Sequence, residues 1–151
     1  KNRPQPMHRK IILRVVSKYF IPMILLFALY VQFHGDFGPG GGFQAGVIFA
    51  SAFVLYSLVF GLDNARRVLP APWIRIGVAL GLLIFGGTGV AALLLGHNYL
   101  DYSALRQDPV QGQHLGIFII EFGVGLTVAS VMVAIFFAFA GRGHKIDEME
   151  D

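Results

Sequence analysis

Cysteine is absent from the 151 residues of this chain, and charged side chains are scarce at 14%. The lack of cysteine excludes a disulfide framework, a thiolate zinc site, an iron–sulfur cluster and a thiol nucleophile within the chain. Soluble domains usually carry about 25% charged residues. Apolar residues instead make up 55% of the sequence, and the mean hydropathy is +0.63. This composition is typical of an integral membrane protein.

Four long apolar stretches divide the sequence, at approximately residues 11–33, 43–61, 74–95 and 115–140. A membrane-spanning helix needs about 20 predominantly apolar residues. We therefore predict an all-α integral membrane protein with four transmembrane helices, which form a single membrane domain over residues 1–151.

Basic residues are distributed unevenly between the predicted connections. Of the 12 Lys and Arg residues, only Arg106 lies between the third and fourth spans; the others precede the first span or lie in its first turns, follow the fourth, or lie around the second connection. Positive charge marks cytoplasmic segments, so both termini are predicted to be cytoplasmic. The net charge of +3 is then a sign of topology, and no nucleic-acid partner is expected.

A glycine-rich motif links the first two spans. It consists of Pro39, Gly40, Gly41, Gly42 and Phe43. Glycine permits close backbone approach, so the motif predicts a packing turn; a run of backbone amides that faces an anion is the alternative. Gly42 and Gly46, and likewise Gly77 and Gly81, are four residues apart, a spacing that favours close helix contacts in lipid.

Glu121 is the one acidic residue inside a predicted span. Ionisable groups at such positions are costly and usually serve a function; the alternative is a protonated glutamate that only hydrogen-bonds a neighbouring helix. His34, Asp36 and Gln44 lie near the first connection and are further candidates for an ion or proton pathway. No diagnostic ligand spacing or catalytic arrangement is present, so we expect no metal, no cofactor and no enzymatic activity.

Two segments of the sequence carry a family resemblance. The glycine motif followed by residues 44–47 (Gln-Ala-Gly-Val), together with residues 121–124 (Glu-Phe-Gly-Val), resembles the MnhB family, the B subunits of Mrp-type multisubunit sodium/proton antiporters. At the position of Asp36 the family commonly has histidine, so the chain departs from the family pattern there. The role of the family's histidine is therefore not assigned to any residue of this chain.

The resemblance implies an accessory membrane subunit of a multisubunit Na⁺/H⁺ antiporter, which helps to build the ion or proton pathway. It further implies other antiporter subunits as partners, Na⁺ and H⁺ as ions, a lipid bilayer as surroundings, and a multi-pass position in the cell membrane of a prokaryote. Two alternatives stay open at this stage: a membrane subunit of a related redox-driven complex of the membrane-bound hydrogenase type, and a purely structural scaffold subunit.

Overall fold

The computed structural model of the chain describes residues 7–35, 40–101 and 107–150. This part is all-helical, and four of its helices are long and apolar enough to cross a membrane. The predicted fold class, an all-α membrane protein with four spanning helices, is therefore confirmed. Which end of the bundle faces the cytoplasm stays a prediction from the loop charges.

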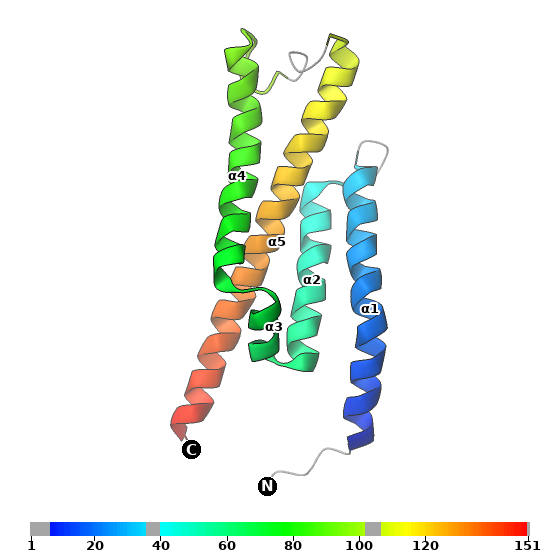
Figure 1. Ribbon diagram of the computed structural model, residues 1–151, viewed down its shortest axis with the longest axis vertical. Helices are drawn as coiled ribbons and strands as arrows, with labels where there is room; N and C mark the ends of the chain where they lie inside the picture. Colours follow the sequence, from blue (N-terminus) through cyan, green and yellow to red (C-terminus); the bar gives the residue numbers. More distant parts are fainter. Residues whose placement is uncertain (1–6, 36–39, 102–106, 151) are drawn as a thin grey trace.

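Five helices follow one another along the chain (Figure 1). They are α1 (Met7–His34), α2 (Gly42–Phe60), α3 (Leu62–Val68), α4 (Ala71–Leu94) and α5 (Pro109–Glu150). The short α3 was not anticipated, although its ends carry a helix signal: Asp63 lies in its first turn and two arginines in its last. Acidic side chains at the N-terminus and basic ones at the C-terminus stabilise the helix dipole.

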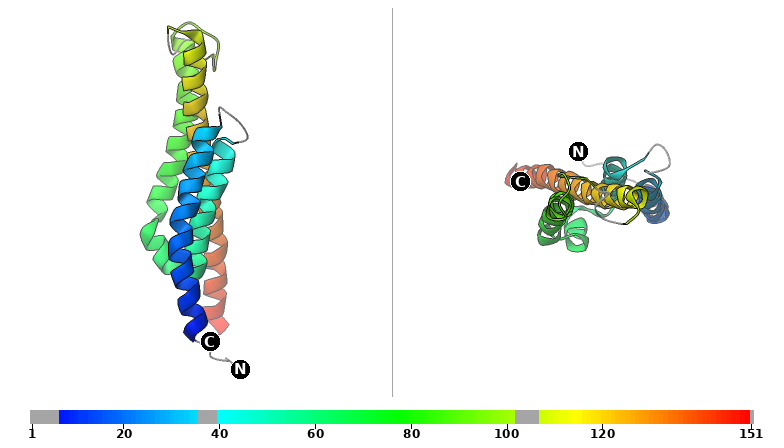
Figure 2. Two further views of the ribbon diagram at one scale, coloured as in Figure 1. Left: turned by 90° about the vertical axis from the view of Figure 1, so that its right-hand side faces the viewer. Right: turned by 90° about the horizontal axis from the view of Figure 1, so that it is seen from above.

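Helix α5 is the central element of the bundle. Helices α2 and α4 pack along it, and α1 packs mainly on α2. Seen end-on in Figure 2, α5 runs obliquely across the bundle. A small apolar core near α3 consists of Ala50, Ala65, Ile74, Val133 and Phe137. Most large apolar side chains are exposed, as expected for helices whose outer faces contact lipid.

Glycine allows the central helices to approach each other closely. A Cβ atom on Gly81 of α4 would lie 2.8 Å from the carbonyl oxygen of Gly123 on α5, and one on Gly46 of α2 would lie 2.7 Å from that of Gly125. Both distances are too short for a methyl group. The small residues noted in the sequence therefore serve internal packing, in which van der Waals contact holds helices together.

At the upper end of the bundle in Figure 1, the α1–α2 hairpin stops well short of the end of the α4–α5 pair. Gly81 lies ten residues, or about 15 Å, after the first residue of the 24-residue α4. Because Gly81 packs on Gly123, the nearby Glu121 lies close to the mid-height of α4. Gly35 and Gly41, at the two ends of the connection between α1 and α2, lie against Glu121, so these two non-helical residues are recessed within the depth that α4 spans.

Candidate functional site

The carboxylate of Glu121 lies against the glycine-rich connection. A Cβ atom on Gly35 would be 2.6 Å from Oε2 of Glu121, and one on Gly41 would be 3.2 Å from Oε1. Glu121 itself is half-buried. Residues from the end of α1 and from the start of α2 thus surround the carboxylate, and they leave room for it because they have no side chains.

Consecutive glycines of the motif contact both α1 and α5. A Cβ on Gly40 would lie 2.8 Å from the carbonyl oxygen of Val31 in α1, whereas one on Gly42 would collide with the carbonyl oxygen of Glu121 in α5. Gly41 has φ of 132°, a region that other residues rarely adopt, and its N–H donates to the Val31 oxygen over 3.4 Å. Gly40, Gly41 and Gly42 therefore lie where the backbones of α1, α2 and α5 approach closely, and they also face a carboxylate.

The N-terminus of α2 supplies the electrostatic environment of this carboxylate. Gly41 is the N-cap of α2, and no side chain caps the helix there. The first amides of a helix lack intrahelical partners, and the dipole places partial positive charge at this end. Oε1 of Glu121, next to Gly41, thus lies where a negative charge interacts favourably with the backbone.

Gln32 lies one helical turn deeper than the glycine turn. Only 7% of its surface is exposed, and its Nε2 has no hydrogen-bond partner among the described residues. Its Oε1 is 2.7 Å from the position of a Cβ on Gly125, one turn after Glu121. The cost of a buried unsatisfied donor is about 1–3 kcal/mol. An oxygen from water, a carbonyl or a carboxylate would satisfy this amide.

A cavity of about 280 Å³ adjoins Gln32. Its lining consists of Ala28, Leu29, Gln32, Ala45, Gly46, Phe49, Phe122, Gly125, Leu126 and Ala129. Gln32 was not among the pathway candidates predicted from the sequence. The available signal was a glutamine between Val31 and Phe33 inside an apolar span, but its missing partner depends on the neighbouring helices.

The other candidate residues are placed differently. Gln44 is exposed, and its Oε1 lies 3.4 Å from the position of a Cβ on Gly41, so Gln44 and Glu121 flank the same glycine. His34 is partly buried and stacks on Tyr30, with ring centroids 5.2 Å apart. Asp36 and Pro39 lie outside the described residues, and Phe43 of the motif is 62% exposed.

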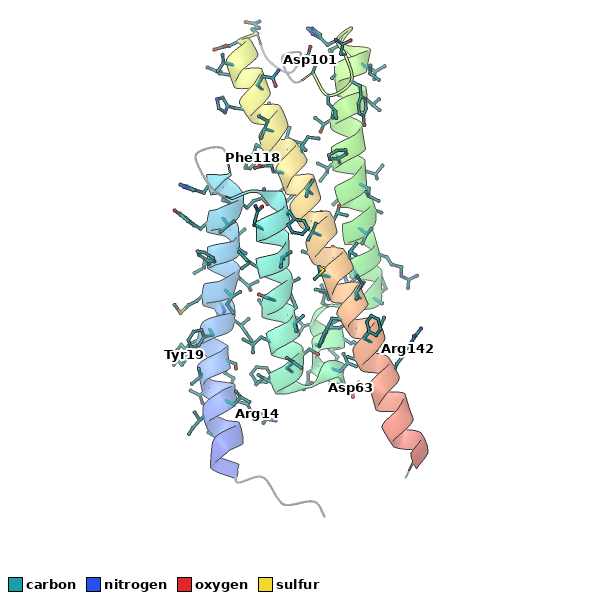
Figure 3. All side chains as sticks on the ribbon, turned by 180° about the vertical axis from the view of Figure 1, so that it is seen from behind. Arg14, Tyr19, Asp63, Asp101, Phe118 and Arg142 are labelled. Carbon is teal, nitrogen blue, oxygen red and sulfur yellow. The ribbon has the colours of Figure 1, made fainter. Side chains whose placement is uncertain are left out.

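An aromatic pair lies about one helical turn before Glu121 along α5. Phe33 of α1 stacks on Phe118 of α5 with centroids 5.6 Å apart, and Figure 3 shows Phe118 level with the end of α1. Within residues 7–35, 40–101 and 107–150, no group of three or more His, Asp or Glu residues could hold a metal ion. As far as these residues describe it, the site consists of the Glu121 carboxylate, side-chain amides and backbone.

Comparison with known proteins gives consistent results. A family model described as "Domain related to MnhB subunit of Na+/H+ antiporter" matches residues 12–134. Proteins named "Putative antiporter subunit mnhB2" from Staphylococcus aureus strains Newman, JH1 and Mu3 are 34% identical to this chain over 134 residues. The alignment covers 87% of this chain and 94% of each relative. The similarity therefore extends over all four membrane helices.

Proposed function

This chain belongs to the MnhB family of Na⁺/H⁺ antiporter subunits, and we propose that Glu121 is the group through which it takes part in ion exchange. The chain is an accessory subunit of a Na⁺/H⁺ antiporter complex. The family points to a transporter and not to an enzyme. Its helices and its relatives make it a membrane protein that works together with other subunits.

The observation that carries the proposal is the position of the Glu121 carboxylate in the recessed glycine turn. Irregular backbone at membrane depth is tolerated only where protein buries it or where it lines a water-filled cavity. A carboxylate in such a place binds either a proton or a cation, because neutralisation by one removes the charge that attracts the other. This competition is the minimum chemistry that exchange of Na⁺ for H⁺ requires.

Nearby groups support such a role for Glu121. The Gln44 side-chain oxygen, on the other side of Gly41, is a second oxygen that a cation can use, since hard cations prefer oxygen ligands. The Nε2 of Gln32, which has no partner among the described residues, is a donor for a water molecule one turn deeper. Asp36 and His34 border the same connection in sequence, and we assign them to the mouth of the pathway.

The surroundings of the site belong to the same proposal. Other antiporter subunits cover the open side of the glycine turn, and Na⁺ and H⁺ are the exchanged ions. The complex lies in the cell membrane of a prokaryote, with both termini of this chain in the cytoplasm. The bacterial source of the relatives and the distribution of lysine and arginine support these assignments.

Glu121→Gln in the complete complex tests the role of the carboxylate, because glutamine has nearly the same shape but cannot ionise. Asp63→Asn is the matched control, since Asp63 is an exposed acid at the other end of the bundle (Figure 3). A hydrogen bond to a charged group contributes about 1.5–3 kcal/mol, so we expect exchange to fall about tenfold or more. The measurement is cation-driven proton movement in membrane vesicles over a range of pH.

The control variant should assemble and exchange ions like the unmodified complex, and Glu121→Asp, which keeps the charge, should retain exchange. If an assembled Glu121→Gln complex is fully active at every pH, the carboxylate has no part in exchange. The glycine turn would then serve packing only, and the subunit would be a scaffold.

A further inference from the structure

A second cavity, whose lining includes two arginines, lies at the end of the bundle away from Glu121. Its volume is about 490 Å³, and residues of α3, α4 and α5 line it on one side. The lining residues are Arg66, Pro70, Ala71, Ile74, Arg75, Ala134, Phe137 and Ala138. Ala138 follows Glu121 by 17 residues on α5, or about 25 Å along the helix, so the two sites are separate.

Two arginines give this cavity a net positive charge. Arg66 donates a hydrogen bond from Nη2 to the carbonyl oxygen of Phe137 over 3.4 Å, which holds its guanidinium against α5. Arg75 makes no hydrogen bond or ion pair with another residue of the described part of the chain. Among the residues that the structure describes, the lining contains no acidic side chain. Asp63 lies at the same end (Figure 3) but is not among the lining residues.

The cavity is at the level where the helices leave the apolar part of a membrane. The candidate span of α4 begins at Ala71, a lining residue, and that of α5 ends at Arg142, four residues after Ala138. Trp73, in the first turn of α4, is 64% exposed, and tryptophan is enriched at the interface between membrane and water. Lipid headgroups lie at this level.

An apolar strip on α4 continues from the cavity toward the middle of the membrane. Val78 and Leu82 follow Arg75 by three and seven residues, a spacing that places all three on one face of a helix. Leu82 is 59% exposed, so this face is accessible beside the arginines. The surface combines a cationic cavity with an apolar strip, as an anionic lipid requires.

We propose that this cavity binds the phosphate of an anionic phospholipid, with Arg66 and Arg75 as its ligands and an acyl chain along Val78 and Leu82. Guanidinium groups match phosphate oxygens in paired hydrogen bonds, and basic pockets between membrane helices recognise anionic headgroups. A zwitterionic lipid brings its own cation to the two arginines and is therefore disfavoured. The proposal is independent of the role of Glu121.

The test uses the complete complex in vesicles that contain a photoactivatable phospholipid with the reactive group in its acyl chain. Phosphatidylglycerol and phosphatidylcholine are compared as probes, and mass spectrometry maps the modified residues of this chain. We expect phosphatidylglycerol to label the segment around Val78 and Leu82 in preference to phosphatidylcholine. Each arginine near a charged surface contributes about fivefold to binding, so Arg66→Gln with Arg75→Gln should abolish the preference.

Arg67→Gln is the matched control, because Arg67 is on the same short helix as Arg66 but does not line the cavity. The Arg67→Gln complex should show the same preference for phosphatidylglycerol over phosphatidylcholine as the unmodified complex. If the double variant does not assemble, Arg75→Gln alone should lower the preference about fivefold. Equal labelling by both lipids, a preference that survives in the double variant, or protection of this segment by another subunit would each overturn the proposal. Competition by free inorganic phosphate would do so too, because it would assign the cavity to a soluble anion.

Discussion

Replacement of Gly81 by alanine tests the close approach of α4 to α5, and Gly86→Ala provides a control on the same helix. A Cβ on Gly81 would lie 2.8 Å from the carbonyl oxygen of Gly123 and 2.9 Å from the amide nitrogen of Thr127, whereas one on Gly86 would meet no atom within 4 Å. Both are interior positions of α4. The two variants therefore share the same chemical change and differ in the space available to it.

The expected magnitude follows from the distances. Ordinary van der Waals contact begins at 3.4 Å, so the Gly81→Ala methyl group must move about 0.6 Å away from the Gly123 oxygen. Overpacking of this kind costs about 1–3 kcal/mol. Replacement of an interior helix glycine by alanine contributes about 0.5–1 kcal/mol of stability. Gly86→Ala should therefore raise the free energy of unfolding slightly. The free energy of unfolding of Gly81→Ala should be about 1–3 kcal/mol lower than that of Gly86→Ala.

The assay is equilibrium unfolding of the full chain in mixed detergent micelles. Trp73 is the only tryptophan of the sequence and lies on α4, so its fluorescence reports on this helix. A difference of 1–3 kcal/mol corresponds to about 5- to 150-fold in the unfolding equilibrium constant. If the two variants unfold with the same free energy, the contact between Gly81 and Gly123 does not set the distance between α4 and α5.

Two further predictions use the same chain. Gln32→Met removes, at nearly constant volume, the buried donor that has no partner among the described residues. The variant should therefore stabilise the full chain by about 1–3 kcal/mol in the same unfolding assay. A loss of stability would show that the amide is satisfied. Because the sequence has no cysteine, single cysteines in place of the exposed Asn98 and Asn64 report topology. An impermeant thiol reagent added outside intact cells should label Asn98→Cys but not Asn64→Cys, and the reverse pattern would invert the orientation.

Composition and hydropathy were sufficient to predict the membrane fold. Four apolar stretches and few charges determine the class, because insertion of each helix into lipid depends mainly on its own hydrophobicity. Glu121 was also identifiable from sequence, since an acid inside a span is costly wherever the span packs. The short α3 was missed because a helix of seven residues is too short to show a hydropathy period.

The partners of these residues depend on the tertiary structure. Glycines four residues apart occur in both α2 and α4, and sequence spacing does not say which helix each pair contacts; in the fold both approach α5. The same packing sets the height of the α1–α2 hairpin, so it brings Gly35 and Gly41 to the carboxylate of Glu121, about 80 residues later in the sequence. It also leaves the Gln32 amide without a partner among the described residues. Close packing between helices in lipid depends on which faces meet and at what height, and this information exists only when all the helices are assembled.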